Sequence, residues 1–350
     1  MARVQYKIAL CQLLVTPDKH GNIARARARI EAAAAAGAKL VVLPEIWNCP
    51  YAMETMRSYA EDIDGGRSPS VSMLSEVAAA RKITIVGGSV PEMASGQLFN
   101  TCCVVGPDGE IKAKHRKLHL FGIDIPGDIT FRESDTFTAG QEPTVVDTDV
   151  GRIGIGICHD IRFPELAMLY RSRGAHLICY PSAFNMSTGQ LLWDLMQKSR
   201  VIDNQLFVVT CSPARDPNSK SDFVVWGNSS LIGPFGEVLA AAGHEDATVI
   251  GEVDLCSIDA VRCETHLFVV DFVLGLVFYF GSGVRGKICA GRTSLWKHRV
   301  EGICTGWSIS RGNVRASCVA LGDGNAVQRT EEGHVCMCWS HAGDGVCTIV

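Results

Sequence analysis

The sequence lacks the features that mark membrane proteins and nucleic-acid-binding proteins. The apolar segment LFVVDFVLGLVFYF, residues 267–280, contains Asp271 and falls short of the roughly 20 residues that span a bilayer. A formal net charge of −4 over 350 residues provides no basic field for nucleic acid or an anionic membrane surface. We therefore expect a globular protein whose partner is a small molecule, with neither nucleic acid nor a membrane bound.

An export signal and a metal-ligand pattern are also missing. The amino-terminal segment MARVQYKIALCQLLV is interrupted by Gln5, Lys7 and Gln12 and has no small-residue cleavage site, so we expect a first core strand there. Without export, the 15 cysteines are expected to be reduced thiols in a cytoplasmic protein. The pair in CMC, Cys336 and Cys338, has no second pair at zinc-site distance, and we expect neither metal nor cofactor.

Strand and helix patterns alternate from about residue 6 to residue 255. Short apolar runs such as KLVVLP are separated by helix-forming segments such as PELAMLYRSRGA, which predicts an α/β (or α+β) class with sheets covered by helices. Hairpins are expected within LFNTCCVVGPDGEIKAKHRK and TVVDTDVGRIGIGIC, and the segments SSLIGPFGEVLAAAG and ATVIGEVDL are expected to finish the domain as another hairpin. After about residue 262 no period of 2 or 3.6 is sustained, and no fold is predicted for residues 263–350.

Three chemically reactive side chains stand where predicted strands end. Glu45 follows KLVVLP, Lys117 lies just beyond the hairpin strand in KAKHRK, and Cys158 follows RIGIGI. Taken singly, each residue has an ordinary explanation: Glu45 as a surface acid, Lys117 as one charge of a solvated run, and Cys158 as a buried structural thiol. Because α/β proteins collect active-site groups on loops at strand ends, their joint occurrence favours a thiol-based active site.

His159 is not expected to be the base that activates Cys158, although the two residues are neighbours. Successive side chains of an extended chain point to opposite faces, so adjacency in sequence separates them in space. A different base must deprotonate the thiol.

The blocks LVVLPEIWN, KHRKLHLF and GICHDIRFPELA, in this order, resemble the carbon-nitrogen hydrolase (nitrilase) superfamily. The segments HLFGIDIPGDITFRES, YPSAFNMSTG and VWGNSSLIGPFGEVLA are similar to its ω-amidase branch, and the resemblance covers residues 5 to about 262. It implies a four-layer αββα sandwich as one domain over residues 1–262, usually paired into a homodimer.

The resemblance also implies a role for each reactive residue. Glu45 would be the general base and later the acid, Cys158 the nucleophile that forms a thioester, and Lys117 the cation that stabilises the oxyanion. The backbone N–H of His159 would assist as a second oxyanion donor. Glu133, in FRES, would hold Lys117; its other reading is a surface acid on a loop.

The implied substrates are short dicarboxylate monoamides such as 2-oxoglutaramate and 2-oxosuccinamate, hydrolysed to ammonia and the dicarboxylate. Arg162 is a candidate to bind the distal carboxylate. The alternative is that Arg162 pairs with Glu165 or Asp160. Three further candidates for the walls of the pocket, each of which is equally consistent with plain core, are Tyr51, Phe121 and Phe184.

Alternatives to this function remain open at this point. Gly122, Ser182 and Asn228 replace the Asp, Gly and His usual in these blocks, so another amidase of the superfamily, acting on deaminated glutathione or N-carbamoyl amino acids, is a rival. True nitrilases usually carry Trp-Glu where this chain has His-Asp after Cys158. Residues 263–350 depart from the family, and a retained intron, a shifted reading frame or an appended module would each explain this tail. Because such a tail could prevent assembly, a non-catalytic scaffold is the alternative class of function.

Overall fold

The structure, a computed structural model, describes residues 5–125, 129–217 and 223–264, together with short strands at 303–310, 313–319, 336–337 and 348–349. The chain divides into two units, Met1–Tyr279 and Phe280–Val350. The first unit carries every candidate site residue and is described first.

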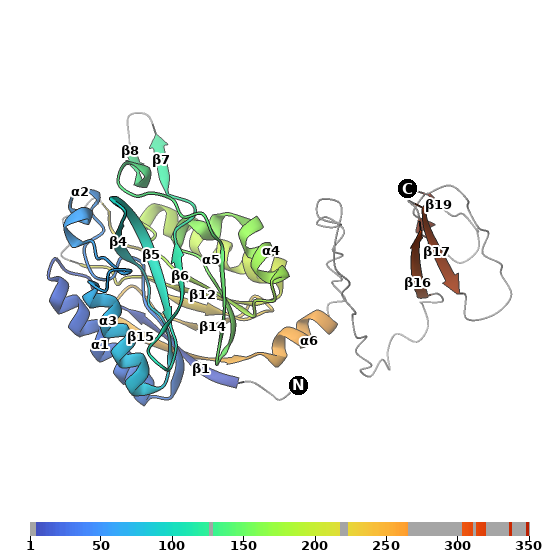
Figure 1. The fold of residues 1–350 in the computed structure, drawn as a ribbon, viewed down its shortest axis with the longest axis horizontal. Helices are drawn as coiled ribbons and strands as arrows, with labels where there is room; N and C mark the ends of the chain where they lie inside the picture. Colours follow the sequence, from blue (N-terminus) through green and yellow to red (C-terminus); the bar gives the residue numbers. More distant parts are fainter. Residues whose placement is uncertain are drawn as a thin grey trace. The chain divides into compact units, whose positions relative to one another are not determined.

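Two β-sheets form the centre of the first unit (Figure 1). The first sheet has the strand order β15 (Ala247–Asp254), β1 (Gln5–Gln12), β2 (Ala38–Val42), β3 (Thr84–Val86), β5 (Gln97–Val105), β4 (Val90–Ala94), with β6 (Ile111–Arg116) also paired to β5. The second has the order β14 (Val238–Ala241), β13 (Ser230–Ile232), β12 (Phe207–Cys211), β11 (Leu177–Pro181), β10 (Gly151–Ile155), β9 (Thr144–Thr148). Each sheet has three parallel strands, β1–β2–β3 and β10–β11–β12, at its centre.

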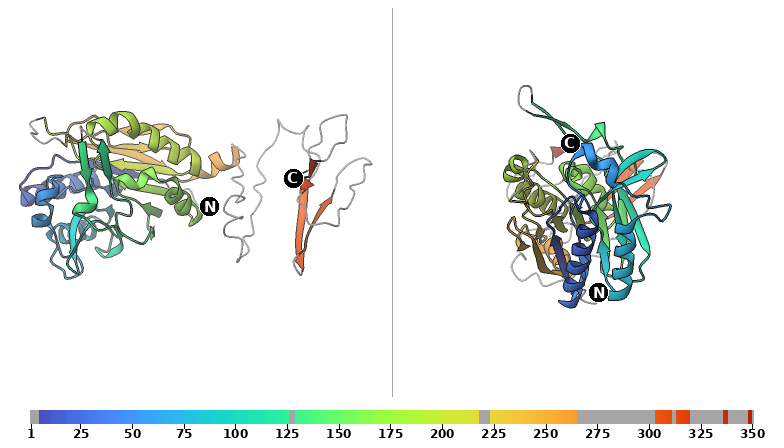
Figure 2. Two further views of the ribbon diagram at one scale, coloured as in Figure 1. Left: turned by 90° about the horizontal axis from the view of Figure 1, so that it is seen from above. Right: turned by 90° about the vertical axis from the view of Figure 1, so that its left-hand side faces the viewer.

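Helices cover the outer face of each sheet, as Figures 1 and 2 show. The first sheet carries α1 (Lys19–Ala35) and α3 (Pro69–Arg81), and the second carries α4 (Pro164–Ser172) and α5 (Met186–Asn204). Asp18, Ser68 and Asn185 cap α1, α3 and α5 by accepting a backbone N–H with their side chains. The αββα sandwich expected from the sequence is confirmed.

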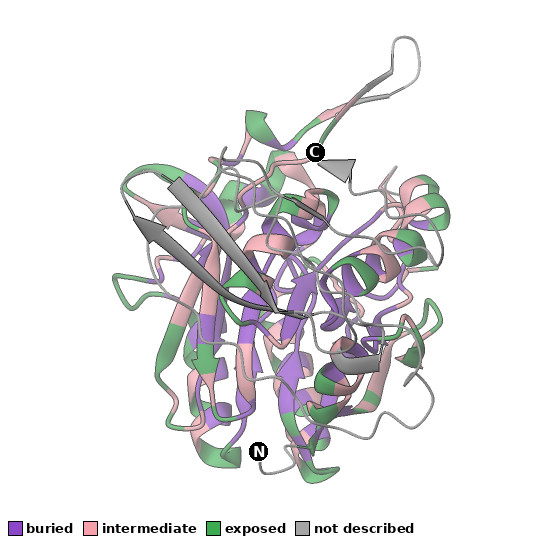
Figure 3. Ribbon diagram, turned by 90° about the vertical axis from the view of Figure 1, so that its right-hand side faces the viewer, coloured by how far each residue is buried: buried purple, intermediate pink, exposed green. Residues whose placement is uncertain are grey.

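Successive side chains of β1 point to opposite faces of the first sheet, which explains how a core forms on each face. Ile8 and Leu10 are buried in the core between the two sheets, whereas Ala9 and Cys11 are buried in the core beneath α1 and α3. All four are almost completely hidden from solvent, and Figure 3 shows buried strands flanked by helices whose outer faces are exposed. Both faces of the central strands are therefore covered, and their ends are left to carry polar groups.

The predicted hairpins β5–β6 and β9–β10 are confirmed. The third expectation is only partly right, because SSLIGPFGEVLAAAG pairs within itself as β13–β14 and ATVIGEVDL takes no part in that hairpin. This segment forms β15, which leaves the second sheet and pairs antiparallel with all eight residues of β1, from Gln5 to Gln12. The pairing covers an edge of the first sheet that would otherwise be exposed. The sequence shows a strand here, but its partner lies more than 230 residues earlier.

Smaller elements near the site were not predicted. β7 (Gly122–Ile125) and β8 (Ile129–Arg132) form a hairpin that stands out at the top of Figure 1, followed by the short 3₁₀-helix η2 (Glu133–Asp135). The loop after β2 contains α2 (Met53–Met56) and η1 (Arg57–Tyr59), and α6 (Cys256–Glu264) follows β15.

The second unit contains two antiparallel strand pairs, β16 (Ile303–Ser310) with β17 (Asn313–Val319) and β18 (Cys336–Met337) with β19 (Thr348–Ile349). Most of the tail predicted to begin near residue 263 lies outside the described residues, and that boundary stays a prediction. Within the described part of the chain, no helix is both long enough and apolar enough to cross a membrane.

Candidate active site

Cys158 lies in a sharp turn at the end of β10. The strand ends at Ile155, and Cys158 begins the 3₁₀-helix η3 (Cys158–Arg162); we call residues 156–162 the cysteine turn. The φ angle of Cys158 is +48°, in the left-handed region that residues other than glycine seldom adopt. Such strain persists where the surroundings enforce it and is concentrated at functional sites. The thiol is buried.

The glycines of the run IGIGI make room for two tyrosines beneath this turn. A Cβ at Gly154 would lie 2.6 Å from Cδ2 of Tyr170, and a Cβ at Gly156 would lie 2.5 Å from Cε1 of Tyr180. The Tyr170 hydroxyl donates to the carbonyl of Ile155 at 2.6 Å. The glycines therefore allow large rings to support the strand that presents Cys158.

Asp160 holds the cysteine turn in place from below. Its carboxylate is fully buried and accepts four hydrogen bonds, two from His119 (backbone N 2.9 Å, Nδ1 2.8 Å), one from the backbone N of Ile157 (2.8 Å) and one from Nε2 of His115 (3.2 Å). Although burial raises the pKa of Asp160, these hydrogen bonds hold it well below its usual range. From α5, the guanidinium of Arg200 donates to the carbonyl of Ile161 at 2.9 Å.

Glu45 lies in the turn after β2, and hydrogen bonds to the loop after β3 hold this turn in place. Ile46, a β-branched residue, has a φ of +48°, and its backbone N donates to the Ser89 hydroxyl at 3.0 Å. The backbone N of Trp47 donates to the Ser89 carbonyl at 3.3 Å, and its indole to the Gly87 carbonyl at 2.7 Å. As at Cys158, a reactive group stands beside a strained backbone that its neighbours enforce.

Glu45, Lys117 and Glu133 form one buried ionic network. Nζ of Lys117 lies 2.9 Å from Oε1 of Glu45 and 2.8 Å from Oε1 of Glu133, and the ion-pairing atoms of all three side chains are inaccessible to solvent. The backbone N of Lys117 donates to the carbonyl of Asn100 at 2.8 Å. The reading of Glu133 as a surface acid is therefore wrong: it is fully buried, in contact with the lysine.

Glu133 has further donors at the base of the β7–β8 hairpin. The Tyr51 hydroxyl donates to Oε1 and the backbone N of Phe121 donates to Oε2 at 2.7 Å. In return the backbone N of Glu133 donates to the Phe121 carbonyl at 2.9 Å. Charged and neutral donors therefore hold this carboxylate in place beside Lys117.

The ionisation of Cys158 and Glu45 is shifted in the direction that proton transfer requires. Burial and the charges of Glu45 and Glu133 raise the pKa of the Cys158 thiol well above its ordinary value, so the resting thiol is neutral. Burial also raises the pKa of Glu45, although Lys117 and the Cys158 thiol partly oppose the rise. Because the pKa of both groups is raised, a proton can pass from the neutral Cys158 thiol to the basic Glu45 carboxylate.

His159 is unsuited to be the base. Burial, Lys117 and Arg162 lower its pKa to about 4, so the imidazole is neutral at physiological pH. The ring lies edge-on to Phe121 and Phe163, at centroid distances of 5.3 and 5.6 Å. Residues 158 and 159 lie in η3 and not in an extended strand, so the expected strand geometry is wrong here, and the low pKa is what disfavours His159 as the base.

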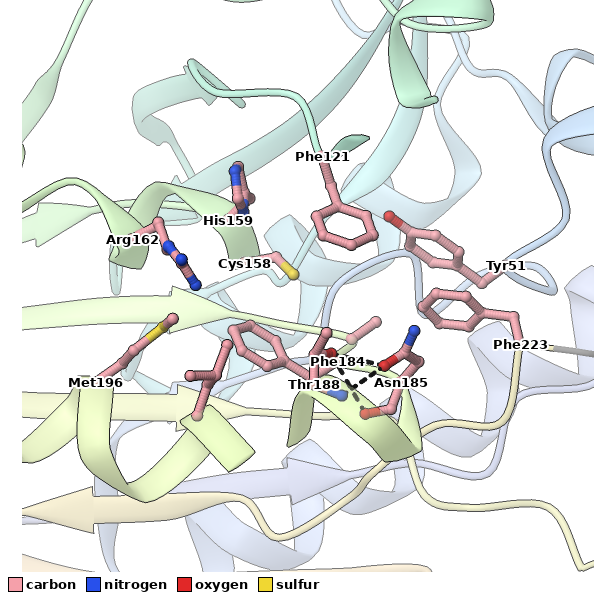
Figure 4. A pocket seen from close by; sticks show the side chains of 12 residues that line it. Tyr51, Phe121, Cys158, His159, Arg162, Phe184, Asn185, Thr188, Met196 and Phe223 are labelled. Carbon is pink, nitrogen blue, oxygen red and sulfur yellow. Dashed lines mark hydrogen bonds between the residues drawn. The ribbon is translucent and has the colours of Figure 1, made fainter. Parts of the chain in front are cut away.

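A pocket opens in front of Cys158 (Figure 4). Its walls include all four residues proposed from the sequence for substrate binding, which are Arg162, Tyr51, Phe121 and Phe184. Six more lining residues were not predicted: Ala183, Asn185, Thr188, Leu192, Met196 and Phe223. Apolar walls with a few polar groups among them are typical of small-molecule sites.

Arg162 lies across the pocket from Tyr51 and Phe223, on the same side as Met196 (Figure 4). Its side chain is exposed, and among the described residues no salt bridge joins it to Glu165 or Asp160. The alternative of an Arg162 pair that fixes the turn is therefore not what the structure contains. The cation is available at the mouth of the pocket.

The carboxylates of this site are paired with a lysine. In the part of the chain that the structure describes, no three His, Cys, Asp or Glu side chains are grouped as metal ligands. Lys117 occupies the position between the two carboxylates where a cation would otherwise be needed.

The sequence matches the profile of the carbon-nitrogen hydrolase family over residues 7–263. A protein from Arabidopsis thaliana named "Omega-amidase, chloroplastic" is 62% identical over 265 residues, which are 75% of this chain and 71% of that protein. "Omega-amidase NIT2" of Homo sapiens is 48% identical over 263 residues, 75% of this chain and 94% of that protein. Among solved structures, Saccharomyces cerevisiae Nit3, a member of branch 10 of the nitrilase superfamily, is 40% identical with a TM-score of 0.70, over 76% of this chain and 96% of Nit3.

Proposed function

The chain belongs to the carbon-nitrogen hydrolase family, and on that premise we propose that it hydrolyses the terminal amide of short dicarboxylate monoamides through a thioester on Cys158. It is a hydrolase that acts on carbon–nitrogen bonds of linear amides, and ω-amidase is the activity in the names of relatives that are 48% and 62% identical. The proposed substrates are 2-oxoglutaramate and 2-oxosuccinamate.

The observation that carries the mechanism is the buried Glu45–Lys117–Glu133 network beside a neutral Cys158 thiol. Among the described residues, Oε2 of Glu45 has no hydrogen-bond partner, so this oxygen is available for a proton. In the proposed reaction it takes the thiol proton while sulfur bonds to the amide carbon. The same proton then passes to the nitrogen as the C–N bond breaks and ammonia leaves.

The carbonyl oxygen that becomes negative needs donors that are already in place. Lys117, whose pKa is raised by Glu133 and Glu45 despite burial, supplies a permanent cation. The backbone N–H of His159 lies in the first turn of η3, where amides lack partners within the helix, and we assign it as the second donor. Water then attacks the thioester with Glu45 again as base, which releases the dicarboxylate and restores the thiol.

We assign Arg162 to the distal carboxylate of the substrate. It is the cation that lines the mouth of the pocket, and its guanidinium has no carboxylate partner among the described side chains. Tyr51, Phe121 and Phe184 would enclose the short carbon chain between the amide and this cation.

A homodimer and a cytoplasmic location are further parts of the proposal. Three exposed apolar side chains of α5, spaced to share one face of the helix, support a second copy of the chain as partner: Leu191, Leu195 and Ile202. The molar mass in solution, measured by light scattering, tests the dimer. Fractionation of cells tests the location, for which a relative named chloroplastic offers the contrasting outcome.

The function is tested by ammonia release from 2-oxoglutaramate, compared with a nitrile and an N-carbamoyl amino acid, for the wild type and Cys158→Ala. We expect ammonia release from the monoamide alone and none from the Cys158→Ala variant. Mass spectrometry of a Glu45→Gln sample incubated with the monoamide shows whether the acyl group is retained on the chain. Equal rates for wild type and Cys158→Ala would reject thiol catalysis. A well-folded wild type without turnover would instead favour the scaffold.

A further inference from the structure

Asn100, in the middle of β5, contacts both of the charged residues that the mechanism uses, Glu45 through its side chain and Lys117 through the backbone. Its side chain is fully buried, and Nδ2 donates to Oε1 of Glu45 at 2.8 Å. Its backbone carbonyl accepts the backbone N–H of Lys117 at 2.8 Å. One residue of a rigid strand therefore touches the base and the segment that carries the lysine.

The hydrogen bonds to Glu45 are distributed unequally between its two oxygens. Oε1 accepts from Nζ of Lys117 at 2.9 Å and from Nδ2 of Asn100 at 2.8 Å, whereas Oε2 is buried and has no partner within the described chain. Two donors on one oxygen fix the plane of the carboxylate, because rotation of that plane would break both. We propose that Asn100 is a positioning residue that fixes the carboxylate of Glu45 so that Oε2 is the oxygen that exchanges the proton with Cys158.

An amide is suited to this position because it donates without adding charge. A second cation beside Lys117 would stabilise ionised Glu45 so strongly that the carboxylate would resist protonation. A neutral donor orients the group and leaves it able to hold the thiol proton until ammonia departs. Oδ1 of Asn100 is buried and has no partner among the described residues, so reversing the amide would place an acceptor against the carboxylate.

The test follows two rates as a function of pH, and rests on the proposed role of Glu45 as base. The titratable groups that face Glu45 are Lys117, Glu133 and Cys158, with Tyr51 nearby. In Asn100→Leu, which removes the donor at similar size, ionised Glu45 loses a hydrogen bond. We expect the acid limb of kcat/KM for 2-oxoglutaramate to move up by about one pH unit, with KM nearly unchanged.

The second rate is alkylation of Cys158 by chloroacetamide, which needs no turnover. We expect its pH profile to shift by the same amount in Asn100→Leu, and no further shift when Asn100→Leu is added to Glu45→Gln. This assay separates the two hypotheses: a wild type that releases no ammonia yet shows these alkylation shifts would reject the proposed function and retain the positioning role.

Asn48→Leu is the matched control, because Asn48 is equally buried and donates to a glutamate, Glu61, at 3.0 Å. It should lower stability and leave both profiles in place. If Asn100→Leu does not fold, Asn100→Asp keeps the shape and brings a carboxyl against Glu45, and the acid limb should then move further upward. Unmoved profiles in whichever variant folds would overturn the assignment. So would a shift on adding Asn100→Leu to Glu45→Gln as large as the shift that Asn100→Leu causes in the wild type.

Discussion

Replacement of Asp160 by Asn tests whether the cysteine turn depends on one buried carboxylate. Oδ1 of Asp160 accepts the backbone N and Nδ1 of His119, and Oδ2 accepts the backbone N of Ile157 and Nε2 of His115. Asn has the same shape but only one oxygen. Its NH₂ group must therefore face one pair of donors.

The size of the stability loss depends on which of the four donors can become an acceptor. An imidazole can exchange its tautomer and accept, but a backbone N–H cannot, so either orientation of the amide leaves one buried backbone N–H, of His119 or Ile157, without an acceptor. An unsatisfied buried donor costs about 1–3 kcal/mol, and the hydrogen bonds that remain lose the contribution of the charge. We expect Asp160→Asn to lower the free energy of unfolding by about 3 kcal/mol, near the upper end of ordinary single substitutions.

Urea denaturation at several pH values is the measurement. The pKa of folded Asp160 is depressed, so its contribution to stability is present above the unfolded value of about 4 and is lost as the pH falls through the folded value. The difference in stability between wild type and Asp160→Asn should thus be constant from pH 7 to pH 5 and shrink below about pH 4. Because the turn carries Cys158, kcat should fall as well, with KM less affected.

A stability within about 0.5 kcal/mol of the wild type, together with unchanged kcat, would refute this reasoning. Asp147→Asn is the control, since Asp147 is an exposed aspartate of the neighbouring strand that pairs with Arg152. It should change neither stability nor rate detectably.

Two further predictions concern the pocket and the strand beneath it. Arg162→Met should raise KM for 2-oxoglutaramate about tenfold or more and change kcat little, as steady-state kinetics would reveal; an unchanged KM would remove Arg162 from the binding of the carboxylate. Gly154→Ala places a Cβ 2.6 Å from the Tyr170 ring and should lower stability by about 1–3 kcal/mol in thermal melts, whereas at Gly122 the nearest atom is 3.8 Å away and alanine should be tolerated. Equal melting temperatures for the two variants would contradict the close packing inferred at Gly154.

Local patterns were sufficient to predict much of this fold, and the failure at β15 shows where they stop. The turn residues Gly106-Pro107-Asp108-Gly109 predict the β5–β6 hairpin because the pairing partners are adjacent in the chain. β15 was recognised as a strand, yet its neighbour in sequence is β14 and its partner is β1. Nothing within a short window distinguishes these two pairings.

The same limit applies to the site. Glu45, Lys117 and Cys158 were found because each has reactive chemistry at the end of a strand, and the resemblance to a family added Glu133. Asn100 gave no such signal, because an amide within an apolar strand looks like an ordinary polar position. Asp160 was considered only as a partner for Arg162, while its actual partners, His115 and His119, lie 45 and 41 residues earlier.

The positions of those histidines relative to Lys117 couple the two halves of the site. His115, Lys117 and His119 lie within one five-residue segment that starts in β6 and continues past its end. The outer two hold Asp160 of the cysteine turn, and the middle one lies between Glu45 and Glu133. A shift of this segment must therefore move the oxyanion cation and the support of the nucleophile together, so the distance between Lys117 and Cys158 is set by one pentapeptide rather than by two independent loops.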